Sequence, residues 1–350
     1  MEEIKLTQYS HGAGCGCKIS PKILDQILHS NFTLPDNEKL LVGNDAKDDA
    51  AVYEIDNGKA LISTTDFFMP IVDDPYNFGR IASANAISDV YAMGGNPIMA
   101  IAILGWPINT ISPAVAKRVI EGSKSICLEA GIPLAGGHSI DSPEPIFGLA
   151  VNGIVDVKNL KKNNTAQEGD LLFLTKKIGV GILTTAEKRG LLLPNELNLA
   201  AEQMMTLNKI GSLLGKESFV NAMTDVTGFG LLGHLVEMAE GSGLSAEIYY
   251  NKIRHITENL VNYIRKGSIP GGTIRNWDSY GHKIFLQNTD EIEIEKTVLA
   301  DPQTSGGLLI AVKAEAVNEV QTILNENNLA EFIIPIGRMI SKKEYVIVVN

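Results

Sequence analysis

Short apolar runs alternate with amphipathic stretches along the first half of the chain, and turn residues separate them. Residues 60–65 form an apolar run that predicts a strand. An Asp-Pro pair at 74–75 supplies a helix N-cap and a first-turn proline, and a Gly-Gly pair at 94–95 should end that helix. The same reasoning predicts a buried strand over 98–104 and a second helix over 112–131.

A polar stretch without periodicity, residues 155–170, interrupts this pattern and marks a boundary between two halves. Beyond it, leucine, methionine and alanine at 231, 232, 235, 238 and 239 have the spacing of an amphipathic helix. We therefore predict an α/β or α+β protein in two halves. Its other second-half elements should be a strand at 171–175, helices at 180–189 and 199–214, and the last strands within 333–349.

Composition and charge narrow the class of protein. The chain has 350 residues, of which 45% are hydrophobic and 20% charged, as in a globular protein with sizeable cores. A net charge of -11 argues against nucleic acid or an anionic membrane as the main partner. The charge is compatible with ATP, because a divalent metal can bridge acidic side chains to phosphates.

The termini and the cysteines favour a cytoplasmic location. The first residues lack the basic start and apolar core of a signal peptide. The longest apolar stretch, residues 97–107, is too short to span a bilayer. Three cysteines, an odd number, fit a reducing compartment better than a disulfide framework.

A Cys-Gly-Cys-Lys run near the N-terminus is the first chemical feature. Cys15 and Cys17 are too close for an easy disulfide and too few for a zinc site, whereas Cys127 falls in a predicted helix and suits a core. A reactive thiolate on a flexible glycine loop is one interpretation, with Lys18 and His11 lowering the thiol pKa. The alternative is a frayed terminus with incidental cysteines.

Aspartates form the second feature, because several follow strands or lie in glycine-rich segments. Mg²⁺ bound to phosphates prefers hard oxygen ligands and a few carboxylates. Capping is the plain alternative for most of them, and Asp225 is well placed to cap a helix. Asp89 resists that explanation because it lies inside a helix, where it shares a face with Asn85. The set comprises Asp45, Asp48, Asp49, Asp66, Asp89 and Asp225.

Glycine-rich joints at 135–139 and 301–307 are the third feature. Such loops can present backbone N–H groups to an anion, although each alone is also an ordinary turn. A Walker motif is absent, because the Gly-Lys pair at 215–216 has the wrong spacing and no following Ser or Thr.

Together these segments resemble the selenide, water dikinase (selenophosphate synthetase) family, in family order and over nearly the whole chain. The later motifs are shared with the wider superfamily of aminoimidazole ribonucleotide synthetase and thiamine-phosphate kinase, whereas the Cys-Gly-Cys-Lys head is specific to the selenophosphate enzymes. The motifs are LTQYSHGAGCGCK at 6–18, GNDAKDDAAV at 43–52, STTDFFMPIVDDP at 63–75, NAISDVYAMGG at 85–95, AGGHSID at 135–141, TDVTGFGLLGH at 224–234 and ADPQTSGGLL at 300–309.

The resemblance implies that ATP, selenide and water are converted to selenophosphate, AMP and orthophosphate. It implies catalytic roles for Cys15 and Lys18 and a magnesium site at Asp49, Asp89 and Asp225. The ATP-binding residues that it implies are Lys18, Ala46, Lys47, Asp48, Asp66, Asp89, Gly137, His138 and Ser139, of which the last three look like a loop reaching ATP from a partner subunit.

The resemblance also implies an architecture. Residues 1–20 should be a flexible glycine-rich catalytic segment, 21–157 a domain for ATP, metal and dimerisation, and 170–350 an α+β domain. The superfamily fold is usually a homodimer whose N-terminal halves build a shared β-barrel. Two other functions stay open: a related kinase or ligase acting on another small metabolite, and a thiol protein that binds selenium or a soft metal without ATP turnover.

Overall fold

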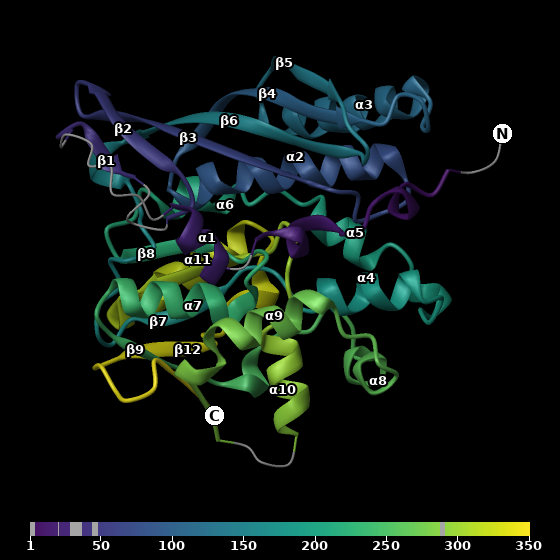
Figure 1. Ribbon diagram of the computed structural model, residues 1–350. Coiled ribbons are helices and arrows are strands. Elements are labelled where there is room, and N and C mark those ends of the chain that lie inside the picture. The colour runs from purple at the N-terminus through teal and green to yellow at the C-terminus, as the bar shows by residue number, and fades with distance from the viewer. Residues whose placement is uncertain (1–3, 20, 29–36, 44–47, 288–290) are drawn as a thin grey trace.

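The computed structural model describes residues 4–19, 21–28, 37–43, 48–287 and 291–350, and its strands form two sheets (Figure 1). The first sheet has six strands in the order β1-β2-β3-β6-β4-β5; β4 and β5 are parallel and the other neighbours antiparallel. Its strands are β1 (Leu40–Val42), β2 (Ala51–Asp56), β3 (Lys59–Phe68), β4 (Asn96–Trp106), β5 (Leu134–Asp141) and β6 (Ile146–Asp156).

Helices α2 (Pro75–Ala92) and α3 (Pro113–Ala130) pack together on this half, and their ends lie where the sequence predicts. Asp74 accepts a hydrogen bond from Asn77 N at 2.8 Å and so caps α2. α3 ends at Gly131, which takes the left-handed conformation (φ 76°) that glycine adopts at low cost.

Two glycines allow α2 and α3 to approach closely. A Cβ atom at Gly79 would lie 1.9 Å from Val119 O, and one at Gly122 would lie 1.9 Å from Tyr76 O. Any larger side chain would therefore push the helices apart. Every residue from 81 to 92 in α2 is buried, as expected for a helix enclosed on all sides.

The second sheet has seven strands in the order β10-β13-β9-β12-β7-β11-β8. The pairs β10–β13 and β13–β9 are parallel and the others antiparallel. Its strands are β7 (Leu171–Leu174), β8 (Val220–Asp225), β9 (Ser245–Ile248), β10 (Ile284–Leu286), β11 (Leu308–Val312), β12 (Gly337–Ile340) and β13 (Ile347–Val349).

One helix prediction in the second half is wrong. The continuous helix expected over 199–214 is divided into α5 (Leu199–Met204) and α6 (Ile210–Leu214). Tertiary hydrogen bonds account for the break, because Lys176 Nζ donates to Thr206 O and Asn208 Nδ2 donates to Gly306 O. The remaining helices are α4 (Val180–Lys188), α7 (Gly230–Gly241), α8 (Leu260–Arg265), α9 (Gly271–Tyr280), α10 (Ile292–Leu299) and α11 (Val317–Glu326).

The two halves meet along α2, which contacts β3 and β6 of the first sheet and β8, α5 and α6 of the second half. The N-terminal segment, with short 3-10 helices at Leu6–Tyr9 and Gly14–Cys17 and then α1 (Pro21–Leu28), crosses this junction (Figure 1, purple). None of the helices among the described residues is long and apolar enough to cross a membrane.

Candidate active site

Strand β3 positions two polar side chains on the face of the first sheet that α2 covers. Ala60, Ile62 and Phe68 are buried on this face, and the period of two in a strand places Thr64 and Asp66 on it as well. The sequence predicted that Asp66 ends this strand; it lies two residues inside it and is 9% exposed. A carboxylate held on a strand in the interior has little freedom to turn away.

Helix α2 brings Asn85 and Asp89 to the same place, because residues four apart lie on one helix face. Thr64 Oγ1 donates to Asp89 Oδ2 at 2.5 Å, and Asn85 Nδ2 donates to Asp66 Oδ2 at 2.5 Å. Asn85 is fully buried and Asp89 is 8% exposed. The solvated face that the sequence left open for this pair is therefore ruled out.

Asp225 and Asp49 join the cluster from opposite halves of the molecule. Asp225 is the last residue of β8 and is 2% exposed; the predicted helix-cap role is wrong, because α7 begins five residues later after Phe229. Asp49 precedes β2 and accepts a hydrogen bond of 2.8 Å from Thr224 Oγ1. No described residue donates a hydrogen bond to the buried Asp49 Oδ2 or Asp225 Oδ2.

Burial and mutual repulsion perturb these acids. Burial, and then the Asp225 carboxylate, raise the pKa of both Asp49 and Asp89 well above the usual range for aspartate. Burial raises the pKa of Asp225 to about 6. Carboxylates that resist ionisation individually become stable as anions when a cation joins them.

These residues fit a divalent cation by the chemistry of their donors. They offer hard carboxylate oxygens, two of which have no partner among the described residues. Within the part of the chain that the structure describes, no three His, Cys, Asp or Glu side chains are spaced so that together they could hold a metal ion. This arrangement suits Mg²⁺, which usually takes few protein ligands and completes its shell with phosphate oxygens and water.

The N-terminal segment is anchored to the connection between β3 and α2 before it reaches this cluster. Thr7 N and Oγ1 donate to Asp73 Oδ1 at 3.1 and 2.6 Å, and Gly14 N donates to Met69 O at 3.0 Å. Gly14 has φ 53°, and a Cβ there would lie 2.5 Å from Thr304 Oγ1. Glycine is therefore required for the chain to pass at this point.

Cys15 is buried at the end of that path, with only 1% of its surface exposed. Its thiol donates to Asn85 Oδ1 at 3.1 Å, and its backbone N–H donates to Thr304 Oγ1 at 3.0 Å. Burial, followed by the Asp66 carboxylate, raises the pKa of the Cys15 thiol, whereas Lys18 acts in the opposite direction. The predicted lowering of this pKa is therefore wrong for the structure described, in which burial protects the Cys15 thiol.

Lys18 and His11 have different surroundings from each other. Lys18 Nζ lies 3.6 Å from Asp66 Oδ2, and the 41% exposed Lys18 side chain is kept charged because Asp66 raises its pKa. His11 Nδ1 lies 2.9 Å from Glu144 Oε2 on the surface, so His11 interacts with Glu144 rather than with the thiol. Lys18 thus places a cation beside a carboxylate of the candidate site.

Among the other predicted ATP-binding residues, Asp48 lies beside the cluster, where its Oδ1 accepts a hydrogen bond of 3.1 Å from Asp49 N. Gly137, His138 and Ser139 are exposed in the edge strand β5, where a loop was expected. Asp48 accepts hydrogen bonds of 3.3 Å from Asn163 N, and burial raises its pKa to about 6. Ala46 and Lys47 lie outside the described residues.

The sequence analysis did not assign several polar side chains to the site. These side chains share one role, which is to hold the aspartates and Cys15 by hydrogen bonds. Asn85 was singled out by its helical spacing from Asp89 but was not assigned to the site. Thr304 and Ser305 lie in the glycine-rich loop that the sequence singled out, but only the fold brings that loop to Cys15. The other missed residues are Thr64, Thr224 and Ser88, whose hydroxyls interact with Asp89, Asp49 and Asp225, respectively.

The raised pKa values predict a pH- and cation-dependent stability. A raised folded-state pKa contributes stability that is complete below the unfolded value, about 3.9, and is lost as the pH rises through the folded value. In metal-free buffer we therefore expect the melting temperature to fall as the pH rises from about 4 past 6, through the pKa of Asp225. At pH 8, Mg²⁺ well above its Kd should raise the melting temperature by a few degrees.

Differential scanning fluorimetry in chelator-treated buffer with and without Mg²⁺ measures this effect. Asp225→Asn should respond less to Mg²⁺ than the unchanged chain. Equal melting temperatures with and without Mg²⁺ at pH 8 would contradict a cation site at these acids.

Comparisons with known proteins point to one family over nearly the whole chain. Residues 47–155 match the family model "AIR synthase related protein, N-terminal domain", and residues 167–350 match its C-terminal domain. The chain is 58% identical over 346 residues to a selenide, water dikinase of Pseudomonas putida, covering 99% of this chain and 98% of the relative. It is 60% identical over 321 residues to that of Photorhabdus laumondii, covering 92% and 91%.

Solved structures share the fold at much lower identity. A thiamine-monophosphate kinase from Stenotrophomonas maltophilia gives a TM-score of 0.65 at 18% identity and covers 90% of this chain and 92% of its own. The hydrogenase maturation protein HypE in complex with ATP gives 0.64 at 19% identity and covers 90% and 87%. These likenesses establish the two-domain AIR synthase-like architecture.

Proposed function

The chain belongs to the selenide, water dikinase family of the AIR synthase-related proteins, and from this premise we propose how its site makes selenophosphate. The enzyme uses ATP to phosphorylate selenide and releases AMP and orthophosphate. We assign the reaction to the junction of the two halves, where the N-terminal segment meets the buried carboxylates. The observation that carries this assignment is the single network joining Cys15, Asn85, Asp66 and Lys18.

The acids on the far side of this network would hold the metal. Asp49, Asp89 and Asp225 are the residues assigned to Mg²⁺, which when bound neutralises phosphate charge and aligns the reacting groups. Thr64 and Thr224 orient two of these carboxylates by hydrogen bonds of 2.5 and 2.8 Å. This support removes most of the freedom that an exposed aspartate would have.

The N-terminal segment supplies the remaining groups. Lys18, held charged beside Asp66, is placed to attract the phosphates of ATP. Cys15 would handle selenium, because a sulfur side chain is the soft group of this site. With the thiol 1% exposed, this segment also excludes water from the first transfer, and it must open for selenide to reach Cys15.

Nucleotide analysis tests the proposed function against the nearest alternative. Anaerobic incubation with Mg²⁺, ATP and selenide should yield AMP, orthophosphate and selenophosphate in equal amounts. A kinase acting on another metabolite would release ADP instead, and a thiol carrier would leave ATP intact. ADP as the main product would refute the proposal.

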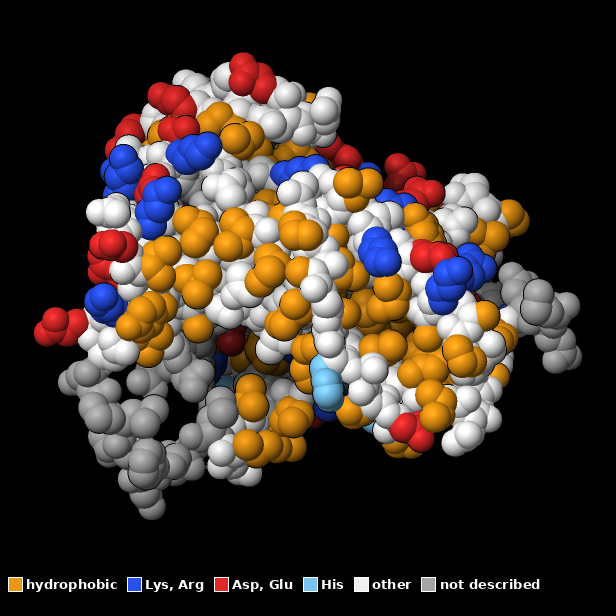
Figure 2. Space-filling view, turned by 90° about the horizontal axis from the view of Figure 1, so that it is seen from above, with side chains coloured by type: hydrophobic (Ala, Val, Ile, Leu, Met, Phe, Trp, Pro, Cys, Tyr) orange, Lys and Arg blue, Asp and Glu red, His pale blue; other side chains and the backbone are white. Residues whose placement is uncertain are grey.

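We further propose that the active form is a homodimer. The outer face of the first sheet, opposite α2, exposes apolar side chains over much of its area (Figure 2). Tyr53, Phe67, Ile101 and Ile140 are 40%, 50%, 40% and 60% exposed, more than single surface hydrophobics require. A second copy packing on this face would cover these apolar side chains. It would also bring its own Gly137, His138 and Ser139 close to the first copy, and such packing would support the shared barrel.

Changing the centre of this face should dissociate the dimer. Ile101→Asp is expected to shift the chain from dimer to monomer, because a buried unpaired carboxylate at the interface costs several kcal/mol. Leu128→Asp, at an 81% exposed position on α3, is the matched control and should stay dimeric. Sedimentation equilibrium measures both; a monomeric unchanged chain would end the dimer proposal.

A further inference from the structure

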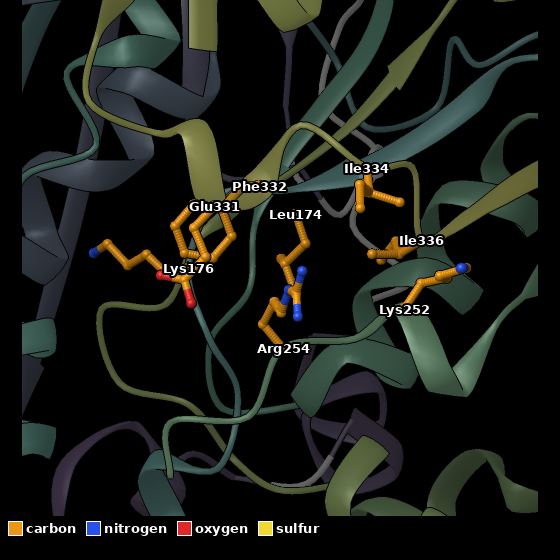
Figure 3. A pocket seen from close by; sticks show the side chains of 8 residues that line it. All are labelled: Leu174, Lys176, Lys252, Arg254, Glu331, Phe332, Ile334 and Ile336. Atoms are coloured by element: carbon orange, nitrogen blue, oxygen red, sulfur yellow. The ribbon is translucent and has the colours of Figure 1, made fainter. Parts of the chain in front are cut away.

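A buried lysine lies behind the active-site loop and has no part in the chemistry proposed above. Lys176 follows β7 and is only 6% exposed. The next residue, Lys177, reaches the surface, where its Nζ lies 2.9 Å from Glu331 Oε1. Lys176 contributes to the lining of a small surface pocket, but its side chain runs away from the other lining side chains (Figure 3). Neighbouring lysines thus have opposite orientations.

The ammonium group of Lys176 is used inside the protein. Lys176 Nζ donates hydrogen bonds to Thr206 O and Ser305 O, both at 2.7 Å. A buried amine is costly, and burial lowers the pKa of Lys176 to about 7, while the nearby Asp225 opposes that shift. A lysine kept in such a position needs a reason beyond packing.

The turn that Lys176 holds is the one that supports Cys15. Ser305 has a left-handed backbone (φ 49°), which is strained for a residue other than glycine. Its N–H donates to Asn85 Oδ1 at 2.7 Å, and this oxygen also accepts the Cys15 thiol at 3.1 Å. The preceding residue, Thr304, accepts the Cys15 N–H at 3.0 Å. Two adjacent residues of the turn therefore hold Cys15, Thr304 through the Cys15 backbone N–H and Ser305 through Asn85.

A second contact fixes the next residue of the loop. Asn208 Nδ2 donates to Gly306 O at 2.8 Å, and a Cβ at Gly306 would lie 2.1 Å from Val226 O. Lys176 and Asn208 thus hold successive carbonyl oxygens of the loop, Ser305 O and Gly306 O. Loss of the Lys176 contact leaves the strained Ser305 free to relax away from Asn85.

We propose that Lys176 is a positioning residue for the selenium-handling thiol: it fixes the Thr304–Ser305 turn and thereby the contact of Cys15 with Asn85. The inference rests on the proposed role of Cys15 and deepens it. The Lys176 ammonium group donates to Thr206 O and Ser305 O, so Lys176 acts through the turn. Its effect should therefore appear in turnover and in the protection of the thiol, and little in the affinity for ATP.

Lys176→Met, which keeps the length of the side chain and removes its donors, tests this inference against Lys177→Met as the matched control. Lys176→Met should lower kcat about 100-fold and leave KM for ATP within about threefold, because a shift near 1 Å in a reacting group has an effect of that size. In a background with Cys17→Ser and Cys127→Ser, iodoacetamide should label Cys15 about tenfold faster. Lys177→Met should change neither value.

Unchanged kcat and unchanged labelling in folded Lys176→Met would overturn the inference, as would a lower melting temperature with normal turnover. If Lys176→Met does not fold, the inference is tested with Lys176→Ala and added ethylamine. Restored turnover together with restored protection of Cys15 would support the positioning role, and failure to restore them would refute it. The labelling rate does not depend on selenophosphate formation. Failure of the unchanged chain to make selenophosphate would therefore count against the proposed function alone.

Discussion

Changing Cys15 to serine is expected to abolish selenophosphate formation, with a loss of at least about 100-fold, while Mg-ATP binding stays within about threefold. Serine has nearly the size of cysteine and can still donate to Asn85, so the buried network should persist. A hydroxyl is harder and far less acidic than a thiol, so it cannot replace sulfur in handling selenium. Selenophosphate is measured by ³¹P NMR and nucleotide affinity by calorimetry.

Cys127→Ser is the matched control for this change, because Cys127 is equally buried, at 1% exposure, but lies in α3 away from the site. It should lose some stability and keep its activity. Selenophosphate made by Cys15→Ser at the normal rate would show that the role assigned to the thiol is wrong. A parallel loss of ATP binding would indicate that Cys15 supports the nucleotide site instead.

The second large effect is expected at the metal site. Asp225→Asn should lower turnover by roughly 1,000-fold, about 4 kcal/mol, because the amide removes one anionic oxygen ligand from the cluster. The affinity for Mg-ATP should fall as well, and Asp49→Asn should behave in the same way. Titration calorimetry with Mg-ATP, together with steady-state rates over a range of Mg²⁺ concentrations, measures both losses.

Asp170→Asn provides the control for removing a buried carboxylate. Asp170 is 2% exposed and accepts hydrogen bonds from Asn221 and from Gln167 N, outside the candidate site. Its loss should lower the melting temperature without changing Mg-ATP affinity. Unchanged Mg-ATP binding and turnover in both Asp49→Asn and Asp225→Asn would contradict the metal site assigned to these acids.

Local chemistry made part of the fold predictable. The strand over 60–65, the Asp74 cap and the helix that follows this cap can be read from neighbouring residues, and the structure confirms them. The break in the helix predicted over 199–214 could not be predicted. It depends on hydrogen bonds from Lys176 to Thr206 O and from Asn208 to Gly306 O, and both bonds join segments that are far apart in the sequence. Helical periodicity carries no information about such contacts.

In the candidate site, too, local features could be predicted from the sequence and long-range contacts could not. The spacing of Asn85 and Asp89 on one helix face was visible in the sequence, whereas their burial against Thr64 and Asp66 was not. The meeting of Asp49 with Thr224 joins positions 175 residues apart, and no local pattern specifies it. The burial of Cys15 likewise depends on Thr304, which belongs to the other half of the chain. The motifs could therefore name candidate residues but could not show which of them touch.

One buried site at the junction of the two halves is proposed to join phosphorus from ATP to selenium. The decisive experiment is anaerobic incubation with Mg-ATP and ⁷⁷Se-labelled selenide, followed by ³¹P NMR. We expect a new phosphorus resonance split by one-bond coupling to ⁷⁷Se, which should be absent from Cys15→Ser and Asp225→Asn. Phosphorus found only in nucleotides and orthophosphate, without a selenium-coupled resonance from the unchanged chain, would contradict it.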